Sequence, residues 1–147
     1  VMGMCLCNDR RWPETWRVMG MQDVDLVMLG YNTPVYNSVA SESPHLRMFH
    51  NHISMQAGAY QNGTWAVGTA KAGMEGGVDM MAGSCIIAPT GEIVALATTA
   101  EDEVIVAECD LDRGRYIRDT VFNFAQHRRI ENYGLITERN EAITPPE

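Results

Sequence analysis

Long hydrophobic runs are missing from this sequence. No apolar stretch approaches the roughly 20 residues of a bilayer-spanning helix, and residues 1 to 7 lack the basic segment and cleavage site of a signal peptide. Basic residues are also few, with a single lysine, Lys71, and a formal net charge of -8. Such a charge repels nucleic acids and anionic membrane surfaces. The sequence therefore predicts no membrane and no nucleic-acid partner, and indicates a cytoplasmic protein.

Cysteine is too sparse for a disulfide scaffold, which favours reduced thiols. A redox CxxC motif is absent, because one residue separates Cys5 from Cys7. These two thiols with His50 and His52 would make four metal ligands by count. Residues two apart on a helix, however, point about 200° apart and cannot converge on one ion. The sequence therefore predicts no metal site.

The hydrophobic pattern predicts an α/β fold in one domain. The chain has 147 residues, of which 46% are apolar, and no internal repeat. A buried strand is expected at 1–7, a sharp turn at 8–11, a helix at 13–22 and a second buried strand at 24–30. This spacing is typical of a βαβ unit with parallel strands. Because the sequence opens inside an apolar run, we expect it to be a fragment of a longer protein.

The rest of the chain is predicted to continue the sheet and then to leave it. Residues 1–126 are expected to form the domain, and 127–147 an extended tail. The helix at 45–63 has most of its apolar residues on one side, namely Leu46, Phe49, Ile53, Met55, Ala57 and Tyr60. The expected elements are a loop at 31–44, that helix, a strand at 64–70, a flexible connection at 72–83, a hairpin at 84–97, a strand at 103–111 and an aspartate-capped helix at 112–124.

Cys7 is the candidate nucleophile. It ends a buried strand at a tight turn into a helix, where α/β folds present an attacking side chain and where the next backbone N–H groups can face a developing oxyanion. Cys5 lies two residues earlier on the same face of the strand and is expected to be a small buried hydrophobic residue. A buried, structural Cys7 is the alternative interpretation.

Polar residues on two loops are candidate substrate contacts. The guanidinium groups of Arg10 and Arg11 suit a carboxylate, although they could also be a solvated turn paired with Asp9 and Glu14. Residues 32 and 33, in the stretch "GYNTP", follow the neighbouring strand, where open α/β sheets bind ligands. Ordinary turn chemistry is the alternative for Asn32 and Thr33.

The stretch "CNDRRWPE" resembles the nucleophile elbow of the nitrilase superfamily of carbon–nitrogen hydrolases. The superfamily pattern is approximately G-x-x-x-C-x-D-x-R-[FW]-P-E, and residues 3–14 match it completely. Within the superfamily the chain is most similar to the N-carbamoyl-D-amino acid amidohydrolases, or D-carbamoylases. That similarity runs from the elbow through "GYNTP", "HLRMFH", "SMQAGAYQNG", "SCIIAPTGEIVA" and "DLDRGRYIRDTVFNFAQHRR" to "YGLI", leaving out about the last ten residues.

The resemblance implies a four-layer α-β-β-α sandwich, here partial and beginning at the strand that bears the nucleophile. Residues 1–126 would be the C-terminal part of a carbon–nitrogen hydrolase domain. It implies a thiol nucleophile, Cys7, with no metal and no organic cofactor. The Asn8 backbone N–H would hold the oxyanion. The positions that match substrate contacts are Asn8, Arg10, Arg11, Asn32 and Thr33, with His50 close to the site. The implied reaction hydrolyses N-carbamoyl-D-amino acids to D-amino acid, ammonia and carbon dioxide through a cysteine thioester.

The resemblance also implies a glutamate base and an oxyanion-stabilising lysine on strands that come before Val1. Glu14 matches the elbow's own glutamate and Lys71 matches no catalytic position, so neither is expected to replace them. Loss of a general base costs on the order of 10²–10⁴-fold in rate. We therefore expect residues 1–147 alone to be close to inactive.

Three alternatives to the D-carbamoylase interpretation stay open. Two are enzymes of the same superfamily, an aliphatic amidase and a β-ureidopropionase. The third is a truncated, non-catalytic α/β domain in which Cys7 is a relic. The polar tail and the faces left uncovered by a missing half predict self-association, as a homo-oligomer of two or four chains.

Overall fold

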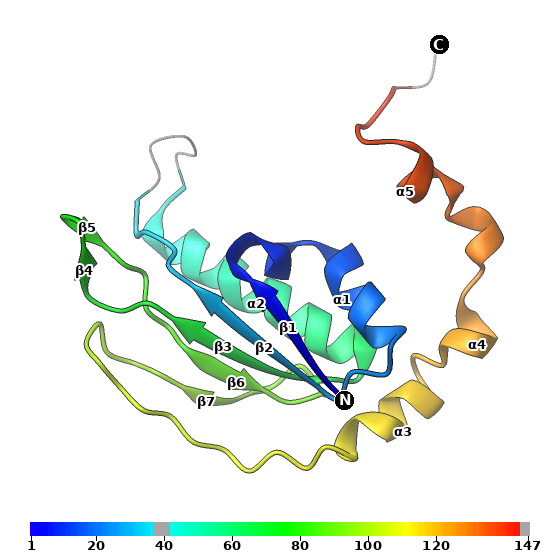
Figure 1. Ribbon diagram of the computed structural model, residues 1–147, viewed down its shortest axis with the longest axis horizontal. Coiled ribbons are helices and arrows are strands. Elements are labelled where there is room, and N and C mark those ends of the chain that lie inside the picture. Colours follow the sequence, from blue (N-terminus) through cyan, green and yellow to red (C-terminus); the bar gives the residue numbers. More distant parts are fainter. Residues whose placement is uncertain (37–41, 145–147) are drawn as a thin grey trace.

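A five-stranded mixed sheet forms the centre of the protein, and two helices cover one of its faces (Figure 1). The computed structural model describes residues 1–36 and 42–144. In the strand order β1-β2-β3-β6-β7 the first three strands run parallel to one another. β6 pairs antiparallel with both β3 and β7, and this mixed sheet with its helices confirms the α/β class. The strands are β1 (Met2–Leu6), β2 (Leu26–Tyr31), β3 (Trp65–Ala70), β6 (Cys85–Ile87) and β7 (Ile93–Leu96).

The first strand, helix and strand form the predicted parallel unit. β1 leads into a 3-10 helix, η1 (Cys7–Arg11), and then into α1 (Pro13–Gly20), which begins on a proline as expected. β1 pairs with β2 so that Gly3 lies opposite Val27. Trp16 of α1 is buried in the core between helix and sheet. The predicted strand, turn and helix are therefore confirmed. The expected burial of the first strand was wrong, because Cys5 is the only buried residue of β1.

Helix α2 (Pro44–Asn62) has the predicted boundaries but not the predicted buried side. Ser43 caps it by accepting a hydrogen bond from the Leu46 N–H at 3.4 Å, and Gly63 ends it with φ 57°. The expected apolar side was wrong, because Leu46, Phe49 and Ile53 are exposed. The side that packs inward carries small and polar residues, which let α1 and the sheet approach closely. It consists of Arg47, Asn51, Met55, Gly58, Ala59 and Asn62.

Gly58 is the point where α1 packs against α2. A methyl group at this position would lie 2.2 Å from the Trp16 ring, well inside van der Waals contact. Gly58→Ala is therefore expected to lower the free energy of unfolding by about 1–3 kcal/mol, despite the better helix propensity of alanine. The control is Gln61→Ala at an exposed position of the same helix. Equal urea midpoints for the two variants would contradict this packing.

Two hairpins follow β3, of which β6 and β7 belong to the main sheet and the other forms a separate two-stranded sheet. β6 and β7 pair antiparallel as predicted, and Gly91, with φ 85°, lies in the turn. The expected flexible connection at 72–83 instead contains a small hairpin of β4 (Met74–Glu75) and β5 (Val78–Asp79). Gly76 and Gly77, both with positive φ, form its tight turn. The glycines that suggested flexibility therefore serve a defined turn.

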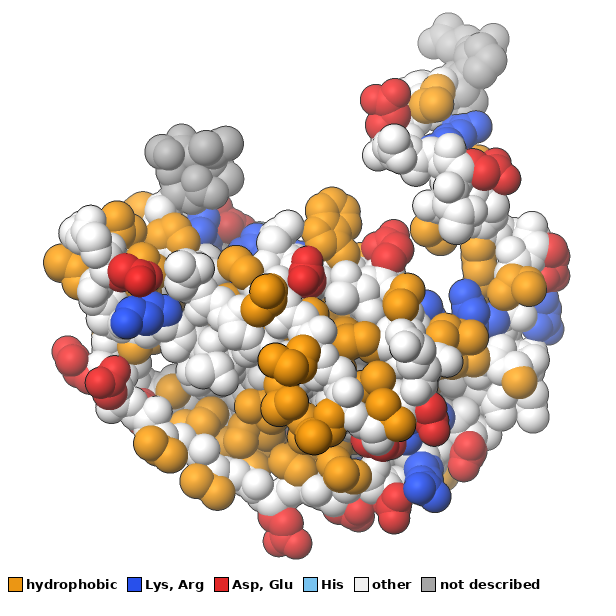
Figure 2. Space-filling view, in the orientation of Figure 1, with side chains coloured by type: hydrophobic (Ala, Val, Ile, Leu, Met, Phe, Trp, Pro, Cys, Tyr) orange, Lys and Arg blue, Asp and Glu red, His pale blue; other side chains and the backbone are white. Residues whose placement is uncertain are grey.

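The second face of the sheet is only partly covered. Trp65, Ile86 and Ala88 are buried there against a segment whose alternate residues, from Ile105 to Cys109, pack inward. This segment is not the strand predicted at 103–111: it alternates as a strand does, but no described strand pairs with it. Elsewhere hydrophobic side chains gather on the surface (Figure 2). On β1 these are Met2, Met4 and Leu6, each about 70% exposed or slightly more.

The C-terminal residues leave the body of the protein as a chain of short helices (Figure 1). The predicted helix at 112–124 is shorter, α3 (Arg113–Asp119), and the Asp112 side chain at its N-cap makes no capping hydrogen bond. The tail predicted as extended instead contains α4 (Phe124–His127), η2 (Ile130–Asn132) and α5 (Gly134–Glu138). Parts of the predicted loop and tail, at 37–41 and 145–147, lie outside the described residues. Within the described ranges, no helix combines the length and the apolar character needed to cross a membrane.

Candidate active site

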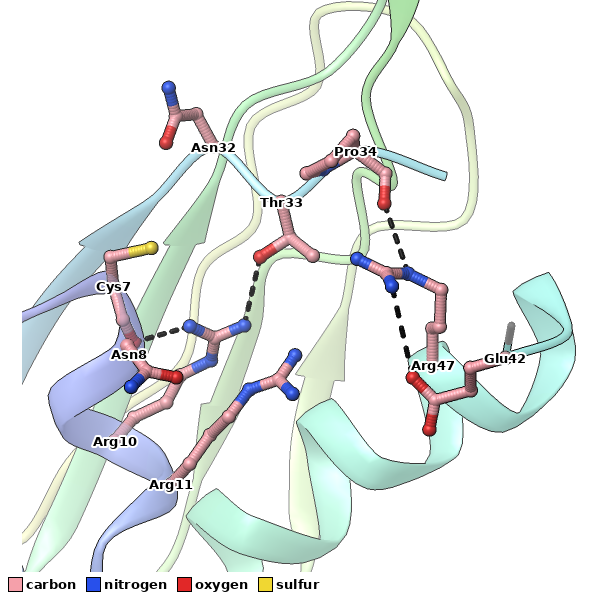
Figure 3. Close-up of a pocket in the computed structure, with 9 residues that line it drawn as sticks. All are labelled: Cys7, Asn8, Arg10, Arg11, Asn32, Thr33, Pro34, Glu42 and Arg47. Carbon is pink, nitrogen blue, oxygen red and sulfur yellow. Dashed lines mark hydrogen bonds and ion pairs between the residues drawn. The ribbon is translucent and has the colours of Figure 1, made fainter. Parts of the chain in front are cut away.

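A cavity of about 220 Å³ opens where β1 and β2 end (Figure 3). The first residue after each strand reaches it, Cys7 from η1 and Asn32 from the loop after β2. The cavity therefore lies at the carboxyl ends of parallel strands, the position predicted from the sequence. Six of the seven predicted site residues line it, together with three that were not predicted. The full lining is Cys7, Asn8, Arg10, Arg11, Asn32, Thr33, Pro34, Glu42 and Arg47.

Cys7 has a strained backbone at the start of η1. Its φ of 41° lies in the left-handed region, which non-glycine residues adopt at an energetic cost. The turn is supported from behind by Asp9, whose carboxylate accepts a hydrogen bond from the Leu6 N–H at 3.1 Å. The Cys7 side chain is half-buried and faces the cavity (Figure 3). A strained, partly accessible thiol at a strand end is the arrangement expected of a nucleophile elbow.

Arg10 is a buried structural centre beneath the cavity. Its side chain is 1% exposed, and each nitrogen donates to a protein oxygen. Nε donates to Asn51 Oδ1 at 2.8 Å and Nη2 to Thr33 Oγ1 at 3.0 Å, while Nη1 donates to the Cys7 carbonyl. The guanidinium carbon also lies 4.0 Å from the centroid of the Tyr31 ring. Arg10 therefore ties the elbow to β2, the loop after it and α2.

Burial sets the ionisation of the groups around Arg10. Loss of hydration lowers the pKa of the Arg10 guanidinium below its usual value. Burial raises the pKa of the Tyr31 hydroxyl to about 12, although the Asn51 amide, which donates to that hydroxyl at 3.2 Å, acts in the opposite direction. Tyr31 is therefore a neutral phenol near pH 7, and the stacked ring supports the arginine cation through its π face.

The other predicted residues take different places around the cavity. Arg11, Asn8 and Asn32 are exposed, whereas Thr33 is buried under Arg10. No hydrogen bond or ion pair joins Arg11 to any residue within 1–36 or 42–144. His50 does not line the cavity, but its Nδ1 contacts the Glu42 carboxylate, which does. His50 is thus linked to the site through a second residue.

Three lining residues were missed by the sequence analysis. Pro34 belongs to the predicted "GYNTP" stretch. Glu42 lies just before α2, and Arg47 lies in its first turns with a side chain that is 5% exposed. The available signal for Arg47 was its position on the same helix side as Asn51, Met55 and Gly58. We missed this signal because the more hydrophobic side of the helix was expected to be the buried one.

Two residues weighed as catalytic replacements lie away from the cavity. Glu14 is exposed in α1 and does not line it. Lys71 lines a different hollow, near Glu101, Asp102 and Glu103. Of the carboxylates in the described residues, Glu42 alone lines the Cys7 cavity. The same residues contain no group of three or more His, Cys, Asp or Glu side chains arranged to hold a metal ion.

The four thiols differ in exposure. Burial raises the pKa of Cys5 to about 11 and that of Cys85 to about 12, and it also raises the pKa of Cys109. Cys7 opens onto the cavity, whereas a raised pKa leaves less thiolate at Cys109, so iodoacetamide at pH 8 is expected to label Cys7 first and Cys109 more slowly. Cys5 and Cys85 should react only after unfolding. Peptide mass spectrometry over time measures the order, and equal rates at Cys5 and Cys7 would contradict it.

Comparisons with known proteins place this geometry in a family. Residues 1–119 match the family model described as "Carbon-nitrogen hydrolase". A nitrilase of Pyrococcus abyssi is 26% identical over 132 residues, covering 90% of this chain and 45% of the relative. This chain therefore spans about half the length of the curated relatives that it matches.

Solved structures share the fold. A carbon–nitrogen hydrolase from Helicobacter pylori G27 has a TM-score of 0.80 at 23% identity, covering 94% of this chain and 49% of that one. An amidase mutant from Nesterenkonia sp. AN1 has a TM-score of 0.60 at 20% identity, over 83% of this chain and 44% of that one; acrylamide has added to its active-site cysteine. The sheet with helices on one face corresponds to half of the expected sandwich. This chain belongs to the carbon–nitrogen hydrolase family of the nitrilase superfamily.

Proposed function

We propose that this chain supplies the nucleophile and the substrate-binding cavity of an enzyme that hydrolyses N-carbamoyl amino acids. The observation that carries the proposal is a strained thiol, Cys7, opening onto a cavity lined by three arginines. In a protein with a formal net charge of -8, three guanidinium groups in one small cavity favour an anionic substrate. The carboxylate of an amino acid derivative is such a group.

In the proposed reaction Cys7 Sγ attacks the ureido carbon of the substrate as a thiolate. The Asn8 N–H, in the first turn of η1, stabilises the oxyanion. The tetrahedral intermediate then breaks its C–N bond, and the amino acid leaves with a proton on its nitrogen. Water attacks the carbamoyl thioester, releases the Cys7 thiol and gives carbamic acid, which decomposes to ammonia and carbon dioxide. The glutamate and lysine implied by the resemblance would transfer the protons and hold the oxyanion.

The D configuration of the substrate is proposed from the resemblance to D-carbamoylases alone. We further propose that the enzyme acts as a homo-oligomer. Support comes from the projecting C-terminal helices, where Ile130, Leu135 and Ile136 are about 60–70% exposed. A cytoplasmic location suits the reduced state of the four cysteines, none of which is in a disulfide.

The chemistry is tested by supplying N-carbamoyl-D-alanine, its L enantiomer and a neutral aliphatic amide. The protein tested should extend upstream of Val1 as far as its relatives do. We expect ammonia release from the N-carbamoyl amino acid, with a carbamoyl adduct on the Cys7 peptide after acid quenching. Hydrolysis of the neutral amide alone would favour the amidase alternative. A start codon at residue 1 or 2 in the gene would favour the non-catalytic alternative.

A further inference from the structure

We infer that Arg47 is a specificity-determining residue that, together with Arg11, binds the carboxylate of the substrate. The inference rests on the proposed function and adds a residue from α2 to a site otherwise formed by the elbow and the loop after β2. It concerns the end of the cavity away from Cys7, where the Glu42 and Arg47 side chains lie (Figure 3).

Arg47 is buried but incompletely satisfied. Its residue is 4% exposed, and Nε donates to the Pro34 carbonyl at 3.1 Å. Within the described ranges Nη1 and Nη2 make no hydrogen bond, and the nearest carboxylate oxygen, of Glu42, lies 3.9 Å from Nη1. The Arg47 side chain is one of those that line the cavity. Arg47 thus presents unused donors to the cavity.

Glu42 places a negative charge at this end of the cavity, but it does not satisfy the hydrogen-bond donors of Arg47. Its carboxylate is shared between Arg47 and His50 Nδ1. A separation of 3.9 Å exceeds hydrogen-bonding distance, so the pair gains Coulomb energy but no charge-assisted hydrogen bond. Burying a guanidinium group is costly unless its donors are paired. A substrate carboxylate would supply the missing acceptors.

Arg10 is not available for the same task. All three of its nitrogens already donate to Asn51, Thr33 and the Cys7 carbonyl. Figure 3 shows the Arg11 guanidinium group extending between Arg10 and Arg47. A carboxylate bound there would lie between two cations that approach from different elements, Arg11 from η1 and Arg47 from α2. A neutral carboxamide would leave this charge uncompensated, which is the basis of the selectivity.

The experiment uses a pair of alkylating reagents of equal shape. N-bromoacetylglycine carries a carboxylate, and N-bromoacetylglycinamide is its neutral counterpart. Each reacts with Cys7 when Sγ displaces bromide, forms a thioether and releases the thiol proton to buffer. The readout is the ratio of the two rates at Cys7, measured by peptide mass spectrometry. Cys109 in the same molecule gives the ratio for a thiol outside the cavity.

We expect the carboxylate-to-amide ratio at Cys7 to exceed that at Cys109 by about tenfold or more, as one or two charge-assisted hydrogen bonds allow. Arg47→Gln and Arg11→Gln should each lower the ratio by roughly tenfold, while reaction with the neutral reagent stays within about twofold. Arg115→Gln, on an exposed arginine of α3, is the matched control and should leave the ratio unchanged.

Retention of the ratio in Arg47→Gln, when Arg11→Gln loses it, would overturn the assignment. If Arg47→Gln fails to fold, Glu42→Gln decides the question: removing the competing carboxylate should raise the ratio at Cys7 by a few fold. A ratio that stays the same or falls in Glu42→Gln would then overturn the inference. Failure of both reagents to label Cys7 would instead contradict the proposed nucleophile.

Discussion

Arg10→Ala is expected to lower the free energy of unfolding by about 3–5 kcal/mol. The substitution removes a cation that is 1% exposed and leaves three oxygens in the interior without their donor. These belong to Asn51, Thr33 and the Cys7 carbonyl. Each polar group left unpaired on burial costs about 1–3 kcal/mol, reduced where water enters the space. Urea denaturation followed by circular dichroism measures the change.

The adjacent Arg11 provides the control. It has the same side chain, lies one residue later on η1, and is exposed. Arg11→Ala should change the free energy of unfolding by no more than about 0.5 kcal/mol, as surface substitutions usually do. Similar losses for both variants would show that the elbow does not depend on the Arg10 network. An Arg10→Ala variant as stable as the unmodified protein would contradict the prediction directly.

The two arginines thus have different tasks, which the sequence could not separate. Side by side in "NDRRWPE", Arg10 and Arg11 were both predicted to contact a substrate carboxylate. The geometry of the 3-10 turn buries Arg10, which donates to Thr33, and leaves Arg11 exposed at the cavity. We therefore expect Arg10 to position the elbow and Arg11 to contact substrate. Only three-dimensional contacts between η1, β2 and α2 distinguish these roles.

Local signals explain what could be predicted. Helix ends could be predicted because a terminal residue acts through its own backbone and its nearest neighbours. These residues are Pro13 at the first position of α1, Ser43 before α2 and Gly63 after it. The apolar runs of β1 and β2 indicated strands by their composition, although β1 is largely exposed in the structure. The position of Cys7 at the end of β1 followed from those two predictions, and with it the location of the cavity.

Long-range pairing explains what could not be predicted. The alternation from Glu103 to Asp110 is real, because Ile105 and Ala107 pack inward, but a strand also needs a hydrogen-bonded neighbour and none is present in the described chain. Arg47 is buried because α2 packs near the loop after β2, where the Pro34 carbonyl accepts a hydrogen bond from it. Helical periodicity alone assigns arginine to the solvent side. Functional polar residues on a buried helix side are therefore the ones that such patterns miss.

Cys7→Ala is expected to abolish hydrolysis of N-carbamoyl amino acids, by roughly 10⁴-fold or more, in a form of the protein extended upstream of Val1. The reason is that no other thiol reaches the cavity: Cys5 and Cys85 are buried in the core, and Cys109 packs on the other face of the sheet. Ammonia release under saturating substrate measures the loss. The variant should still fold, because the Cys7 side chain is only half-buried and an alanine keeps its β-carbon.

Cys5→Ala is the matched control, two residues earlier on the same strand. Its sulfur lies in the core beneath the sheet, and burial raises its pKa to about 11, so that little thiolate exists at neutral pH. Its substitution should cost about 1 kcal/mol of stability, from lost packing, and leave turnover within a few fold. Residual hydrolysis in Cys7→Ala that disappears only when Cys5 is also replaced would assign the reaction to the other thiol. Because only Cys7 opens onto the arginine-lined cavity, we expect the double variant to be no less active than Cys7→Ala.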